Sequence, residues 1–259
     1  MEFRNIILEK KGGVATITLN RPKVRNALDV ETLLEIGAAV EDIDSDLDVR
    51  VVLITGAGTA FCSGADLGGI AGLVDKPRDY FLRLWNRVFS SIDNMGKPVI
   101  AVINGIALAG GLELVMACDL AIASEDARLS DQHANYGLVP GGGGSQRLPR
   151  LIGIRKAKEL LYTGDWLSAG EGERLGLINK VVPANKLKEA TNELVAKLLS
   201  KSPMALKTVK RLVNYGMETT LAAGLEMEIV GAIAHSSTED LAEGISAFME
   251  KRPPVFPGR

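Results

Sequence analysis

The sequence predicts an α/β fold, with a mostly parallel sheet in the first part of the chain and helices in the second. Apolar, β-branched stretches alternate with segments of helical periodicity up to about residue 150. Strands that alternate with helices are typical of parallel sheets joined by right-handed crossovers. From about residue 153 the chain is expected to be mainly helical.

The individual elements follow from local patterns. The segment "VATITLN" alternates in the manner of a half-buried strand, whereas "VRVVLITG" is a continuous apolar run typical of a strand covered on both faces. Asp29 is a suitable N-cap for the first helix. In chain order we expect strands at 5–10 and 13–20, a helix from 30 to about 43, a strand at 50–56, a helix within 70–95, a strand at 98–105, a helix at 110–119 and a strand at 120–124.

Composition excludes several classes of partner. The 259 residues include 30 Lys and Arg against 32 Asp and Glu, for a formal net charge of −2. This balance gives no reason to expect nucleic acid or an anionic membrane as a partner. No apolar run approaches a membrane span, and the N-terminus lacks the features of a signal peptide. Because Cys62 and Cys118 have neither disulfide-framework nor metal-ligand spacing, we expect a cytoplasmic, reduced protein without a metal site.

Glycines after the strand at 50–56 suggest a nucleotide site, but the detailed patterns fail. In "LITGAGTAFCSGAD" the third glycine of a dinucleotide-binding loop is replaced by Phe61. A serine-hydrolase elbow needs a glycine two residues on either side of the serine, and Ser63 has Phe61 and Ala65 there. Both readings are therefore weak.

Two glycine-containing corners remain, "FCSGAD" and "GIALAGGLE", and each follows a buried strand. A helix that opens at Gly110 would present free N–H groups, and two such corners side by side would form an oxyanion hole. From spacing alone the structural alternative is favoured, because helix capping and tight strand–helix packing explain most glycine pairs. Glu113, in the first turn of that helix, is either a carboxylate stabilised by the helix N-terminus or a base beside the hole.

At these residues the chain resembles the crotonase family, the enoyl-CoA hydratases and isomerases. The resemblance runs from about residue 5 to the C-terminus. It implies a spiral of strand–strand–helix repeats over residues 1–197 and a helical C-terminal trimerisation region over 198–259, in a homotrimer or a homohexamer. The motifs that carry it are "NRPKVRNAL", "AFCSGADL", "KPVIAVINGIALAGGLELVMACD", "GLVPGGGGSQRLPRLIG", "AKELLYTGDWLSAGEGERLGLINKVV" and "EGISAFMEKRPP".

The resemblance also implies where a substrate binds. In the family two backbone N–H groups hold the thioester oxygen, and they map to Ala65 and Gly110. Gly141–Gly144 is similar to a rigid family loop close to the active site, and we expect 69–82 to line the acyl pocket. CoA arrives as part of the substrate, so no separate cofactor is expected. The residues that match the family's CoA-binding segments are Lys23, Val24, Arg25 and Ala27, and then Ala65, Asp66, Leu67 and Gly68.

The family's hydratases use two glutamates for proton transfer. The first maps to Glu113, but the position of the second holds His133. An imidazole can exchange protons near neutral pH, so the two residues can divide water activation and protonation of the α-carbon in either order. Asp131 is placed to orient the imidazole. Alternatively, His133 only forms a hydrogen bond with a loop, and the chain has lost the ability to add water to a substrate. His235 is expected to be structural or exposed.

The expected activity is therefore enoyl-CoA hydration, the addition of water across the double bond of a 2-enoyl-CoA thioester. Another crotonase reaction on an acyl-CoA is the nearest alternative, namely double-bond isomerisation, thioester hydrolysis or a carbon–carbon lyase step. A non-catalytic acyl-CoA-binding or RNA-associated protein on the same scaffold is a further one, because a fold does not fix a function.

Overall fold

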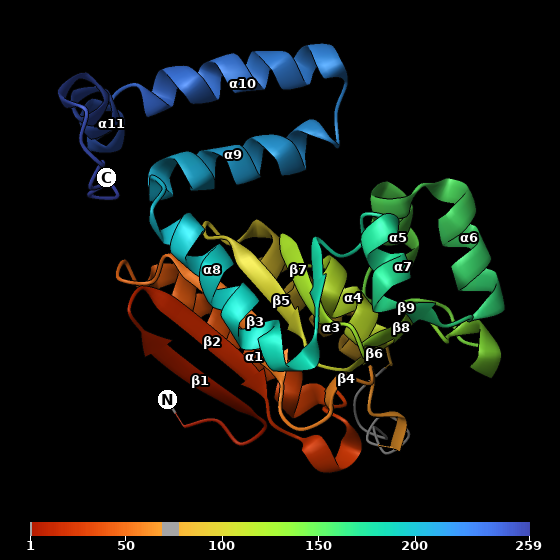
Figure 1. Cartoon of the computed structure of the whole chain (residues 1–259). Coiled ribbons are helices and arrows are strands. Elements are labelled where there is room, and N and C mark those ends of the chain that lie inside the picture. Colours follow the sequence, from red (N-terminus) through yellow and green to blue (C-terminus); the bar gives the residue numbers. More distant parts are fainter. Residues whose placement is uncertain (1, 69–77) are drawn as a thin grey trace. The chain divides into compact units, whose positions relative to one another are not determined.

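The computed structural model describes residues 2–68 and 78–259 (Figure 1). The chain divides into two compact units. One contains Met1–Met95 and Val99–Thr191, and the other contains Gly96–Pro98 and Asn192–Arg259. The family-based division at residue 197 stays a prediction.

The described residues of the first unit form a six-stranded sheet and a four-stranded sheet. The larger sheet has the order β1-β2-β3-β5-β7-β10; β1 and β2 form an antiparallel hairpin, and every other neighbour in it is parallel. Gly12 and Gly13 close the hairpin with φ angles of +60° and +82°, which favour glycine. The strands are β1 Ile6–Lys11, β2 Val14–Leu19, β3 Val51–Gly56, β5 Val99–Ile103, β7 Leu120–Ser124 and β10 Lys180–Val182.

A second, smaller sheet gives the fold its spiral character. It has the order β4-β6-β8-β9, and its strands are β4 Ala60–Cys62, β6 Ile106–Leu108, β8 Arg128–Ser130 and β9 Leu167–Ser168. Strands β3, β5 and β7 of the large sheet are each followed along the chain by a strand of the small one. Each turn of the chain thus adds one strand to each sheet, which confirms the expected α/β class with strand–strand–helix repeats.

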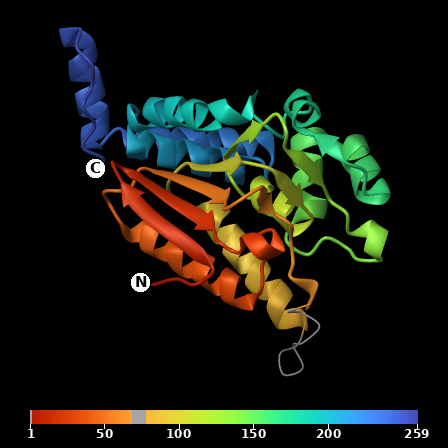
Figure 2. The same cartoon turned by 60° about the horizontal axis from the view of Figure 1, so that its bottom comes forward.

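Helices α1 (Val30–Ser45) and α3 (Arg78–Asn94) lie side by side against the large sheet (Figures 1 and 2). Asp29 caps α1 as expected, because its side chain accepts a hydrogen bond from Thr32 N. Helix α3 buries Leu84, Trp85, Val88 and Phe89, whereas Tyr80 is 36% exposed. The other helices of this unit are α4 Gly110–Met116, α5 Gly144–Ile152, α6 Ile154–Thr163 and α7 Ala169–Arg174, with 3-10 turns at Pro22–Val24, Ala134–Tyr136 and Ala184–Lys186.

The second unit is helical. Helix α8 (Leu187–Leu199) spans the boundary between the units, and α9 (Pro203–Gly216) and α10 (Leu221–His235) then pack side by side (Figure 1). Hydroxyl side chains cap three of its helix N-termini, a local signal that fixes where each helix begins. These caps are Ser202 for α9, Thr220 for α10 and Thr238 for α11 (Glu239–Glu250).

The proline-rich tail docks within its own unit. Asp240, which is 1% exposed, accepts a hydrogen bond from Gly258 N at 2.7 Å through one carboxylate oxygen, and its other oxygen accepts one from Ser202. Glu243 binds Val255 N at 2.7 Å and pairs with Arg252. The tail is therefore held against α11 and the start of α9. Among the described residues, we find no helix with the length and apolar character that a membrane span requires.

Candidate active site

A cavity of about 80 Å³ in the first unit opens between α3, the N-terminus of α4 and the loop before α5. The two glycine corners expected from the sequence both reach it, through Ala65 and Gly110. Glu113 and His133 also line the wall, so the structure brings four predicted site residues to one cavity. The remaining lining residues are mostly apolar: Leu67, Phe81, Leu82, Trp85, Leu138, Val139, Gly141 and Gly142.

The backbone at this cavity presents two unused donors. Neither Ala65 N–H nor Gly110 N–H has a hydrogen-bond acceptor within residues 2–68 and 78–259. The two corners are in close contact, because a Cβ on Gly64 would lie 2.9 Å from Gly110 N. Ala109, the residue before α4, has φ +45° and ψ −113°. This backbone conformation is unusual for alanine, and it sets the direction in which the helix begins.

The glycine run holds Glu113. This side chain is 2% exposed, and its Oε1 accepts hydrogen bonds from Gly142 N and Gly144 N, each at 2.8 Å. Burial raises the pKa of Glu113 above its usual value, while the two N–H donors and the nearby His133 act in the opposite direction. The loop at Gly141–Gly144 is therefore a positioning element for a buried carboxylate.

His133 and Asp131 form a hydrogen-bonded pair beside Glu113. Nδ1 of His133 lies 2.9 Å from Oδ1 of Asp131, and the two side chains are 13% and 1% exposed. Burial alone would lower the pKa of His133, but the hydrogen bond and charge of Asp131, together with the charge of Glu113, raise it above its usual value. The sequence-based placement of Asp131 against the imidazole agrees with this geometry.

Gly142 has no room for a side chain. A Cβ there would overlap the Trp85 indole at Nε1 and Cδ1 and would lie 2.6 Å from Oε2 of Glu113. The same loop is fixed from outside, because Arg147 donates to the Gly142 carbonyl at 3.0 Å and pairs with Asp93. A substitution at Gly142 should therefore displace the Glu113 carboxylate without replacing any titratable residue.

We expect Gly142→Ala to lower kcat by about 100-fold, because a displacement of about 1 Å of a reacting group costs that much. Steady-state kinetics with an enoyl-CoA, the substrate that the family resemblance implies, measure this effect. Gly216→Ala is the control, since a Cβ at Gly216 meets nothing within 4 Å. Equal kinetics for the two variants would show that the position of Glu113 does not depend on this close contact.

The two segments expected to bind CoA lie next to each other. Ser63 N donates to the Arg25 carbonyl at 3.0 Å, and Leu28 and Ala65 form a parallel bridge. In the first segment Lys23, Val24 and Arg25 are exposed. Ala27 is only 7% exposed, so a ligand there would meet mainly its backbone. In the second segment Asp66 is half-buried, and Leu67 and Gly68 are exposed. Their contacts with CoA stay a prediction.

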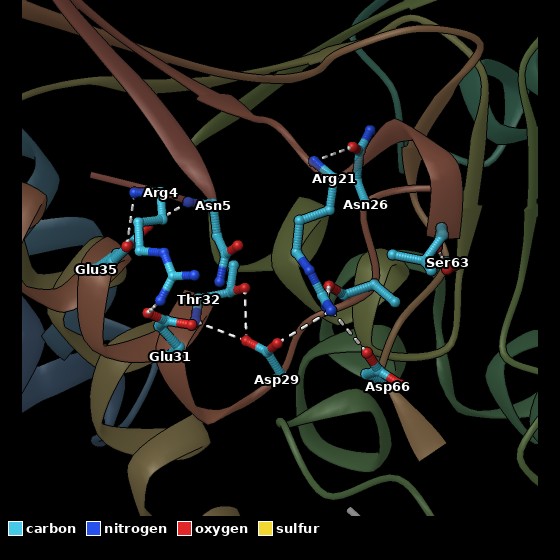
Figure 3. Close-up of polar contacts among 12 residues, drawn as sticks. Arg4, Asn5, Arg21, Asn26, Asp29, Glu31, Thr32, Glu35, Ser63 and Asp66 are labelled. Atoms are coloured by element: carbon cyan, nitrogen blue, oxygen red, sulfur yellow. Dashed lines mark hydrogen bonds and ion pairs between the residues drawn. The ribbon is translucent and has the colours of Figure 1, made fainter. Parts of the chain in front are cut away.

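An ion network that we did not predict from the sequence fastens these segments together (Figure 3). The Arg21 guanidinium lies between Asp29 and Asp66, with Nη2 at 3.1 Å and 2.9 Å from their carboxylates. Asn26, 1% exposed, donates to the carbonyls of Ala57 and Ala60. Both residues belong to the quoted loop "NRPKVRNAL", but Asp66, Ala57 and Ala60 are distant from it in the sequence.

Trp85 also lines the cavity, and we did not predict it as a site residue from the sequence. Its side chain is 3% exposed, and its Nε1 has no hydrogen-bond partner within the described residues. Of the segment 69–82 that we expected to line the acyl pocket, 69–77 lie outside the described residues, whereas Phe81 and Leu82 do line the cavity. His235 is half-buried in the second unit, at the end of α10, and does not line this cavity.

The spiral fold places a buried carboxylate and an imidazole in one cavity, beside backbone N–H groups without an acceptor among the described residues, and this arrangement is typical of the active site of an enzyme. Comparisons with known proteins specify the family. A sequence model of the enoyl-CoA hydratase/isomerase family matches residues 9–259. The chain belongs to this family, which confirms the resemblance to the crotonases.

Relatives cover nearly the whole chain. It is 41% identical over 253 residues to the short-chain-enoyl-CoA hydratase of Clostridium acetobutylicum, with 97% of each chain covered. It is 42% identical over 257 residues to the crotonyl-CoA hydratase of Syntrophomonas wolfei, with 99% of each covered. The crystal structure of an enoyl-CoA hydratase from Bacillus anthracis matches with a TM-score of 0.95 at 39% identity, over 99% of this chain and 100% of that one.

Proposed function

We propose that this protein is an enoyl-CoA hydratase that adds water across the double bond of a short 2-enoyl-CoA thioester. The observation that carries the proposal is the convergence of two free N–H groups, Glu113 and His133 on one small, mostly apolar cavity. The curated names of relatives at 41% and 42% identity support the hydratase activity and the short acyl chain.

The reaction divides among these groups as follows. Glu113, whose carboxylate form the Gly142 and Gly144 N–H donors stabilise, removes a proton from water while the water oxygen bonds to the β-carbon. The electron pair of the double bond moves toward the thioester oxygen, and the N–H groups of Ala65 and Gly110 stabilise the resulting enolate. The α-carbon then takes a proton from His133, which gives the 3-hydroxyacyl-CoA.

The substrate's CoA part is assigned to the two adjoining segments of the first unit. Lys23 and Arg25 supply positive charge on an exposed loop, where phosphate groups of CoA would pair with them. The backbone around Ala65 to Gly68 then leads the thioester from this loop into the cavity, which Leu67 helps to line. CoA is part of the substrate, and no further cofactor takes part in the proposed reaction. We place the enzyme in the cytoplasm as a homotrimer or homohexamer.

The test is a crotonyl-CoA assay that follows loss of the conjugated enoyl-thioester absorbance and identifies the product by mass. A gain of one water with the thioester intact supports hydration. Release of free CoA thiol would favour thioester hydrolysis, and tight binding without any turnover would favour a non-catalytic acyl-CoA-binding protein.

A further inference from the structure

The carboxylate of Asp131 contacts both the backbone and the side chain of His133. Its Oδ1 accepts the backbone N–H of His133 at 3.3 Å and lies 2.9 Å from the imidazole Nδ1. A short side chain two residues before the histidine thus fixes both the backbone and the ring. With Nδ1 engaged, Nε2 is the ring nitrogen left for the cavity that His133 lines.

Two buried carboxylates adjoin this imidazole, and a protonated ring would offset part of their negative charge. Asp131 is 1% exposed, and its Oδ2 has no hydrogen-bond partner within the described residues. Glu113 is a second buried carboxylate nearby: a Cβ on Gly144 would lie 3.1 Å from Glu113 Oε1 and 3.4 Å from Asp131 Oδ2. A buried negative charge is costly without a cation beside it.

His133 is the group placed to supply that cation. Within the described part of the chain, Asp131 and Glu113 are the titratable groups that face the imidazole, and the other residues that line the cavity there carry no charge. The nearby guanidinium of Arg147 is engaged by the Gly142 carbonyl and by Asp93. Two carboxylates therefore act on one imidazole, which favours its protonated form.

We propose that Asp131 is a positioning residue that keeps His133 as an imidazolium, with Nδ1–H bound to Asp131 and Nε2–H directed into the cavity as the acid for the α-carbon. The proposal rests on the proposed hydration. The Nε2–H bond breaks as the new C–H bond forms, and its electron pair stays on Nε2. The neutral ring keeps its Nδ1–H bond to Asp131, and the proton that Glu113 took from water restores the charge balance once it returns to Nε2.

Nitrogen-15 NMR of the imidazoles tests the assignment without any turnover. The chain has two histidines, so a His235→Gln background leaves His133 as the single signal. We expect Nδ1 to stay protonated throughout the titration, with a pKa above the ordinary 6.5. A His133 signal that is neutral below pH 6.5, or that carries its proton on Nε2 when neutral, would overturn the proposal even if neither of the Asp131 variants below folds.

Two substitutions separate the charge of Asp131 from its hydrogen bond. Asp131→Asn keeps an acceptor and removes the charge, so the pKa of His133 should fall while the Nδ1–H form persists. Asp131→Ala removes both, and the neutral ring should then lose its preference for Nδ1–H. If neither variant moves the titration or the tautomer, Asp131 has only a structural role.

Kinetics give the second readout. Asp131→Asn should lower kcat for crotonyl-CoA hydration by about 100-fold with little change in KM, because it lowers the fraction of His133 that carries the proton and leaves substrate binding unchanged. The alkaline limb of the pH profile should move to lower pH, since a weaker hold on the proton loses it earlier. An equal loss at every pH would overturn the proposal. If the wild type shows no hydration, the NMR result still decides the role of Asp131 and the failure belongs to the proposed function.

Discussion

Glu113→Gln is expected to lower kcat/KM for hydration by on the order of 10³–10⁴-fold, the upper part of the range for loss of a general base. The amide is nearly isosteric, and its oxygen can still accept the N–H bonds of Gly142 and Gly144, which now reach Oε1 at 2.8 Å. What disappears is the ability to take a proton from water. The fold and the affinity for CoA should therefore survive while the chemistry does not.

Stopped-flow or steady-state loss of enoyl absorbance measures the effect, with Glu41→Gln, an exposed glutamate of α1, as the matched control. The pH profile adds a signed test. Because burial raises the pKa of Glu113 above 4.5, wild-type activity should be lost as pH falls through that raised pKa, which lies above the value of an exposed glutamate. Hydration by Glu113→Gln at more than a tenth of the wild-type rate would remove Glu113 from the mechanism.

The sequence predicts the long elements of this fold because their periodicity is local. The apolar run at β3 and the capped helix α1 both appear where they were expected. Strands β4, β6 and β8 were not predicted, because each has three residues, too few for a pattern. Their pairing depends on parallel partners from the next turn of the chain, such as Ala60 with Ile106.

The site divides in the same way. Glu113 and His133 stand out in the sequence through residue type and motif position, and both line the cavity. The partners that define their states are tertiary. Gly142 N reaches Glu113 across 29 positions, and the Trp85 indole closes the wall from α3. Asp131 lies only two positions from His133, so its contact with the imidazole could be anticipated locally.

The sharpest test of the charge on His133 compares the effect of Asp131→Asn on activity in two proteins, one with His133 and one with His133→Glu, because we expect the effect to have opposite signs. His133→Glu places in this chain the carboxylate that the family's second catalytic position usually carries. Here it would be a third buried carboxylate beside Asp131 and Glu113, whose side chains are both nearly inaccessible to solvent. Like charges at this spacing cannot all ionise, so we expect a loss of on the order of 10³-fold in kcat/KM.

Adding Asp131→Asn to His133→Glu should restore activity by roughly tenfold or more, since one pKa unit of relieved repulsion corresponds to a factor of ten. The same Asp131→Asn change lowers activity when His133 is present, because there the carboxylate stabilises a cation. A double-mutant cycle on kcat/KM therefore has a large coupling term of defined sign. If Asp131→Asn is equally harmful in both backgrounds, Asp131 supports the loop rather than the charge of His133. The two carboxylates and the imidazole would then have to be treated as independent groups.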